Sequence, residues 1–195
     1  MLALPNRSDD VPNIRANAAM SRALPEKRGL TTQSLTLDDA PPIVVGDLTV
    51  PNAKLTNACY AHYAGQPVDP TKWKSDPWKP VMRDIEGRDV DWQNAKTIDP
   101  EWRLFARSAG DDKAPIIGML AALDAIHAEG LKPQANLRLV FEGEEEAGSP
   151  HLAQYLEKYP KVLRPDAWVL CDGPVHQSRK AELFFGARGT IDLEL

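Results

Sequence analysis

The sequence contains little cysteine and no long apolar run. Its 195 residues include two cysteines, Cys59 and Cys171, and no Cys-x-x-Cys pair, so a disulfide framework is not expected. Both cysteines lie in apolar, strand-like runs, which favours two buried thiols that pack as small hydrophobic side chains and leaves a disulfide between them as the less favoured alternative. No segment approaches the roughly 18 to 20 apolar residues of a membrane-spanning helix. We therefore expect no membrane association.

We expect neither a basic binding surface nor a secretory leader. The chain has 23 basic and 28 acidic residues and a net charge of −5, so it offers no basic stripe for a phosphate backbone, and nucleic acid is not an expected partner. Its start lacks the basic and apolar regions of a secretory signal peptide, which favours a cytoplasmic location. The composition, 43% hydrophobic and 26% charged, is typical of one folded globular domain with a sizeable core.

The sequence does contain two short acidic segments, residues 107–113 and 142–149. The first carries Asp111 and Asp112, and the second carries Glu144, Glu145 and Glu146 in a row. Such neighbouring carboxylates repel one another unless they are spread into solvent or neutralised by cations. Each segment has a simpler explanation, a solvated loop for the glutamates and a helix N-cap for either aspartate. Two Zn²⁺ ions that share a bridging carboxylate would also offset the clustering.

The position of these acidic residues relative to the expected strands favours a metal site. Residues 137–141 alternate like a strand and lead directly into the glutamates, whereas the apolar runs 57–61 and 167–171 lead into His62 and Asp172. Ligands of an open α/β sheet bind beyond the carboxyl ends of its strands. Three such strand ends with potential metal ligands predict one shared site there.

The order of the remaining segments predicts an α/β fold. A mostly parallel open sheet with helices on both faces is expected, because strands and helices alternate along the second half of the chain. A stretch without sustained periodicity, residues 63–103, carries four tryptophans that we interpret as packing anchors. Helices are predicted at residues 13–24, which begin at an Asn13 cap, at 113–129 and at 150–159, and two further strands at 30–37 and 42–50.

Five segments in this order resemble the di-zinc exopeptidases that include carnosinase, other dipeptidases, acetylornithine deacetylase and succinyl-diaminopimelate desuccinylase. The similarity runs from about Pro12 to the last residue, and its motifs are specific in combination and order. The segments are residues 60–67, 107–113, 142–149, 172–174 and 185–189.

The resemblance implies a hydrolase that cleaves a peptide or related amide bond in dipeptides or short peptides with the help of two divalent ions. Zn²⁺ is expected, with Mn²⁺ or Co²⁺ as alternatives. By position, Asp111 would bridge the ions, His62 and Asp172 would complete one ion's ligands, and Glu146 would serve the other. Glu145 would be the general base. Asp112 and Lys113 would have no ligand role.

Two departures from the family pattern favour an alternative to an active enzyme, namely a homologue without catalytic activity. Position 64 is Ala64 where the family has an aspartate that orients the histidine ligand, and loss of such a partner typically costs about 10- to 100-fold in metal affinity or activity. Residues 1–184 would be the first part of the catalytic domain and residues 185–195 the first strand of a lid or dimerisation domain, so the chain is expected to be an N-terminal fragment without the family's last histidine ligand. A homodimer would form through the missing lid.

The alternatives to an active hydrolase are a truncated or degenerate non-catalytic homologue and a metal-free α/β domain with an acidic rim.

Overall fold

The structure is a computed structural model that describes residues 1–173, 176–186 and 189. Its main sheet has five strands in the order β1-β2-β6-β3-β7. Strands β6, β3 and β7 run parallel, whereas β2 is antiparallel to both β1 and β6. The predicted α/β class is thus confirmed, with an antiparallel pair at one edge of the sheet. The strands are β1 (Thr31–Leu35), β2 (Ile43–Leu48), β3 (Thr56–His62), β6 (Asn136–Glu142) and β7 (Ala167–Leu170).

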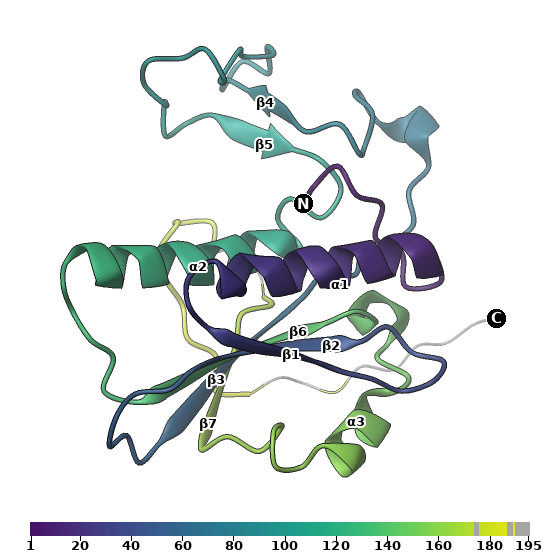
Figure 1. The fold of residues 1–195 in the computed structure, drawn as a ribbon. Helices are drawn as coiled ribbons and strands as arrows, with labels where there is room; N and C mark the ends of the chain where they lie inside the picture. Colours follow the sequence, from purple (N-terminus) through teal and green to yellow (C-terminus); the bar gives the residue numbers. More distant parts are fainter. Residues whose placement is uncertain (174–175, 187–188, 190–195) are drawn as a thin grey trace.

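Helices cover both faces of this sheet (Figure 1). Helices α1 (Val11–Glu26) and α2 (Lys113–Ala128) lie on one face, and the short α3 (Leu152–Lys158) lies on the other. The connection through α2 leads from β3 to β6, and the connection through α3 leads from β6 back across β3 to β7. These two crossovers move in opposite directions across the sheet. Right-handed crossovers of that kind must lie on opposite faces.

The hydrophobic core is divided into two layers by the alternation of side chains along each strand. On β2, Val44 packs with the α1 and α2 layer, whereas its neighbours Ile43 and Val45 pack with the layer on the α3 side. On β6, Phe141 and Val140 divide in the same way. The alternating apolar residues of the sequence therefore fill both faces of one sheet.

The first helix begins earlier than predicted. Asp10, not Asn13, is its N-cap, and the Asp10 side chain accepts a hydrogen bond from the Asn13 backbone N–H. Pro12 occupies the first turn, where a missing N–H costs little. Pro25 lies in the last turn of the helix, which ends one residue later.

The tryptophan-rich stretch contains a small second sheet that the sequence did not predict. Strands β4 (Val81–Arg83) and β5 (Arg103–Phe105) pair antiparallel, and a 3₁₀ turn, η1 (Pro70–Lys72), precedes them. This sheet lies on the far side of α1 and α2 from the main sheet (Figure 1). Trp73, Trp78 and Trp102 are half-buried, as packing anchors would be, but Trp92 is exposed.

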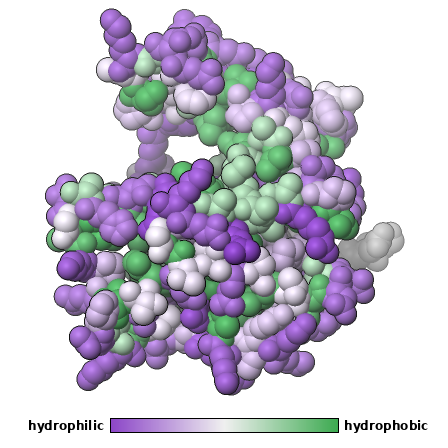
Figure 2. All heavy atoms as spheres, in the orientation of Figure 1, coloured by the Kyte–Doolittle hydropathy of each residue, from purple (hydrophilic) through white to green (hydrophobic). Residues whose placement is uncertain are grey.

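The predictions about the surface and the two cysteines are confirmed in part. Figure 2 shows hydrophilic residues over most of the visible face, with small hydrophobic patches between them. No helix among the described residues is long and apolar enough to cross a membrane. Cys59 and Cys171 are both free, as favoured, but the prediction that they are buried is wrong, because both are only half-buried.

Two adjacent isoleucines of α2 test this packing. Ile116 is fully buried in the core, whereas Ile117 is 47% exposed. Replacing Ile116 with alanine should lower the free energy of unfolding by about 2 to 5 kcal/mol, because a cavity opens beneath the helix. Ile117→Ala is the matched control and should change it by no more than about 0.5 kcal/mol. Equal losses in urea unfolding would contradict the assigned core face of α2.

Candidate metal centre

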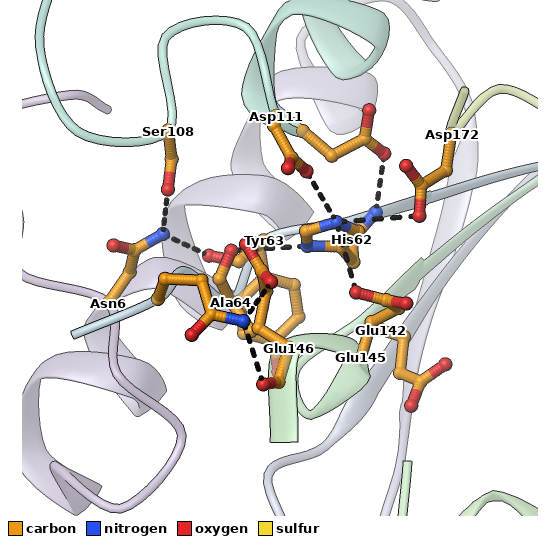
Figure 3. Close-up of polar contacts among 12 residues, drawn as sticks. Asn6, His62, Tyr63, Ala64, Ser108, Asp111, Glu142, Glu145, Glu146 and Asp172 are labelled. Atoms are coloured by element: carbon orange, nitrogen blue, oxygen red, sulfur yellow. Dashed lines mark hydrogen bonds and ion pairs between the residues drawn. The ribbon is translucent and has the colours of Figure 1, made fainter. Parts of the chain in front are cut away.

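The predicted site residues meet at the carboxyl edge of the main sheet (Figure 3). His62 is the last residue of β3 and is paired in register with Glu142, the last residue of β6. The turn after β6 carries Glu145 and Glu146, and Asp172 follows β7. Asp111 stands directly before the first turn of α2. The parallel register therefore brings segments that are distant in sequence to one place.

A single buried imidazole lies at the centre of this cluster. The His62 side chain is fully buried, and its Nε2 lies 3.1 Å from Asp111 Oδ1, 3.5 Å from Glu145 Oε2 and 3.6 Å from Asp172 Oδ2. Asp111, at 71% side-chain exposure, is the most open of these partners. One edge of the ring thus faces three carboxylates.

Two sets of side chains at this edge have the donors that a divalent cation needs. His62, Asp111 and Glu146 form one set, and His62, Asp112 and Asp172 form the other; in each set the ligand atoms all lie within 4.8 Å of one another. Imidazole nitrogen and carboxylate oxygen are ordinary ligands of Zn²⁺. The chemistry of this donor set therefore fits a bound cation.

Burial raises the pKa of two acids in this cluster. Burial raises the pKa of the Asp112 carboxyl to about 7. Burial, together with the nearby Asp172 and Glu146 carboxylates, also raises the pKa of Glu145 above its ordinary value. Such elevated values are typical of functional sites.

The side chain of Asp112 contacts the main chain of His62. Asp112 Oδ2 accepts a hydrogen bond of 3.0 Å from the backbone N–H of His62, and both groups are buried. The peptide bond between Asp111 and Asp112 is cis. The resemblance implies no ligand role for Asp112; in the structure its side chain holds the end of β3, and it is also one of the three residues of the second donor set.

Sequence reasoning missed two contacts that hold site residues in place. Gln66 Nε2 donates to Glu146 Oε2 at 2.6 Å and to the Glu146 carbonyl oxygen at 3.3 Å. The backbone carbonyl of Ala64 lies 3.1 Å from His62 Nδ1. Gln66 belongs to the same motif segment as His62, so the sequence offered a signal for its role. The Ala64 carbonyl offered none, because every residue type has a main-chain acceptor.

Lys113 joins the head of α2 to the N-terminal segment. It is buried, and its Nζ donates to Asn17 Oδ1 at 2.7 Å and to the Met1 and Leu4 carbonyl oxygens at 3.1 and 3.4 Å. Burial lowers the pKa of Lys113 to about 8. Its ammonium group points away from the carboxylate cluster into this anchoring contact.

Residues 58–186 match the model of peptidase family M20/M25/M40. The chain belongs to this family. The resemblance inferred from the motifs is thereby confirmed; the assignment of individual ligands and of the base stays a prediction. The prediction of a lid strand over residues 185–195 falls mostly outside the described residues and stays a prediction.

Several members of the family are similar over most of this chain. The Cys-Gly metallodipeptidase of Schizosaccharomyces pombe is 31% identical over 171 residues, which are 84% of this chain and 32% of that protein. The human Beta-Ala-His dipeptidase is 28% identical over 76% of this chain and 27% of its own length. The chain thus spans about a third of the length of these curated relatives or less.

Solved structures of the family share this fold. An M20 family metallo-carboxypeptidase from Sulfolobus solfataricus superimposes with a TM-score of 0.73 at 28% identity and covers 92% of this chain and 37% of its own. Human carnosine dipeptidase 1 superimposes with a TM-score of 0.69 at 23% identity, over 88% of this chain and 36% of that one. The sheet and helices described above are therefore those of M20 peptidase catalytic domains.

The hydrogen bond from His62 to Asp112 can be tested by two substitutions that remove the same charge. Asp112→Ala leaves the buried His62 N–H without its acceptor, whereas Asp112→Asn retains an oxygen in nearly the same place. The alanine variant should be less stable than the asparagine variant by about 1 to 3 kcal/mol. Urea unfolding measures the difference. Equal stabilities would show that the bond contributes nothing to the fold.

Proposed function

We propose that this chain provides the metal-binding half of a hydrolase active site that cleaves a peptide bond, or a related amide bond, in dipeptides or short peptides. The observation that carries the proposal is the convergence of three carboxylates on the buried His62 ring at the carboxyl edge of a parallel sheet. Membership of a peptidase family supports it. Two relatives that are named for dipeptide substrates, Cys-Gly and Beta-Ala-His, favour a dipeptide.

The metal-ligand roles are those that the resemblance to the family implies, and the clustering of these side chains around His62 supports them. We assign Asp111 as the carboxylate shared between two ions, His62 and Asp172 to one ion, and Glu146 to the other. Zn²⁺ fits these ligands, with Mn²⁺ and Co²⁺ as alternatives, because imidazole and carboxylate do not select sharply among them. When bound, such ions polarise the scissile carbonyl and bring the pKa of water towards neutrality.

Glu145 is assigned as the general base. It accepts a proton from the attacking water as the C–O bond forms, and later transfers that proton to the nitrogen of the leaving amine as the C–N bond breaks. Its Oε2 lies 3.5 Å from His62 Nε2, within the same cluster as the ligands. Its raised pKa brings the carboxyl nearer to neutral pH, where a group can both take and return a proton.

One observation favours a second candidate, a homologue that binds metal without turnover. Ala64 stands where the family pattern has an orienting aspartate, and such a loss lowers activity in other metal sites. The two candidates share their metal ligands and differ only in catalysis. Metal binding and turnover must therefore be measured separately.

Metal binding tests the ligand assignment. The purified native polypeptide should contain close to two equivalents of zinc by elemental analysis, and its melting temperature should fall on chelation and rise again with added Zn²⁺. His62→Ala should lose this response. His127→Ala is the control, because His127 is exposed in the last turn of α2 and should behave as wild type. A protein that holds no metal under these conditions would overturn the assignment.

Turnover tests the base. Glu145→Gln should lower the rate of dipeptide hydrolysis by about 10²- to 10⁴-fold, because the proton acceptor is lost. The metal content should stay unchanged, since Glu145 is not assigned as a ligand. Glu146→Gln, the neighbouring control, should instead lower the metal content. Full metal content in the wild type with no hydrolysis of any dipeptide would favour the non-catalytic homologue.

A further inference from the structure

The His62 ring is oriented by a main-chain group, although position 64 carries no polar side chain. His62 Nδ1 lies 3.1 Å from the backbone carbonyl oxygen of Ala64 (Figure 3). A carbonyl oxygen can only accept, so this contact places a proton on Nδ1. The opposite nitrogen, Nε2, is the one that faces Asp111, Glu145 and Asp172. This is the arrangement that a metal-ligating histidine needs.

The carbonyl of Ala64 is held in place by hydrogen bonds to its own peptide group and to the peptide group before it. Asn6 Nδ2 donates to the carbonyl oxygen of Tyr63 at 2.8 Å, and the Gly65 backbone N–H donates to the Asn6 carbonyl oxygen at 2.9 Å. Asn6 is fully buried. One residue of the N-terminal segment thus fixes both peptide groups that flank the Ala64 Cα, including the one that contains the acceptor.

Asn6 also reaches the loop that carries Asp111. Its Nδ2 donates to Ser108 Oγ at 3.0 Å, and Ser108 is buried three residues before that aspartate. The packing allows no side chain at Gly65, because an added Cβ would lie 2.3 Å from Ser108 Oγ and 2.7 Å from Asn6 Oδ1. Figure 3 shows Asn6 between Ser108 and Tyr63. A single amide therefore joins two of the segments that supply the cluster, the one that follows His62 and the one that carries Asp111.

We propose that Asn6 is a positioning residue: it holds the Ala64 carbonyl against His62 Nδ1, so that a main-chain acceptor replaces the orienting carboxylate that position 64 lacks. The inference rests on the proposed metal site, because the orientation of the ring matters only if Nε2 binds a metal ion together with the neighbouring carboxylates. Asn6 itself touches no predicted ligand side chain. It acts on the His62 ring through the segment 63–65, and it also contacts the loop that carries Asp111 through Ser108.

The experiment compares Asn6→Ala with Asn136→Ala in the native polypeptide. The Asn136 side chain also makes two hydrogen bonds, accepting from the Val50 N–H and donating to Thr56 Oγ1, but it lies at the opposite end of the sheet. Zinc affinity, measured by competition with a chromophoric chelator, should fall about 10- to 100-fold in Asn6→Ala, the usual effect of losing an orienting partner. It should be unchanged in Asn136→Ala. Asn6→Ser, which leaves a smaller gap, serves in place of Asn6→Ala if that variant does not fold.

A second measurement needs no metal. In ¹⁵N-labelled protein the Nδ1 proton of His62 should exchange slowly with solvent, because it is buried and hydrogen-bonded, and it should exchange much faster in the Asn6 variant. Unchanged exchange and unchanged zinc affinity, in a variant that is merely less stable, would overturn the inference. If the wild type binds no zinc, the metal proposal fails, and the exchange measurement alone then decides the role of Asn6.

Ala64→Asp tests the same inference by adding the carboxylate that position 64 lacks. Ala64 is fully buried in the core layer below α1 and α2, so the new carboxylate should reduce stability. Because the ring already has its acceptor, zinc affinity should not rise. A gain of about tenfold or more in Ala64→Asp would mean that the ring lacks an adequate orienting group in the wild type, and it would refute the role assigned to the carbonyl.

Discussion

The repulsion among carboxylates around one buried imidazole is the constraint on which the site depends. In each of the two donor sets, oxygens from two acidic residues lie within 4.8 Å of each other. Two like charges at that separation cost about 3 to 4 kcal/mol at an effective dielectric constant of about 20. A domain of ordinary stability has only about 5 to 15 kcal/mol in total. An arrangement of this kind is stable when protons or cations neutralise part of the charge.

The parallel strands make this arrangement possible because they end at the same edge of the sheet. The pairing of His62 with Glu142 fixes where β3 stops relative to β6, and α2 begins directly above that edge. Hydrogen bonds to main-chain groups then hold the two ends together, since Asp112 accepts from the N–H of His62. The acids are thus placed by backbone geometry, and the core beneath them, with Val44 and Phe141 among its residues, keeps that geometry rigid.

Local patterns in the sequence predicted the parts of the fold that depend on local properties. The apolar run that leads into His62, the alternating run that leads into Glu142 and the helical period that follows Asp112 are visible without any structure, and they were enough to place the acidic residues at one edge. The Asn13 cap was wrong because Asp10 competes for the same turn. The β4 and β5 strands escaped notice because three residues are too few to show a period.

The contacts that could not be predicted are those made by main-chain groups and by residues far away in sequence. Asn6 lies 57 residues from Tyr63 and 102 from Ser108, so no local pattern could connect them. The carbonyl of Ala64 is present whatever residue occupies that position. A main-chain acceptor also adds no charge to an already acidic cluster, whereas an aspartate at position 64 would add one more carboxylate. The requirement for an oriented ring is then carried by Asn6 and Gly65, and position 64 is free to pack as an apolar residue in the core.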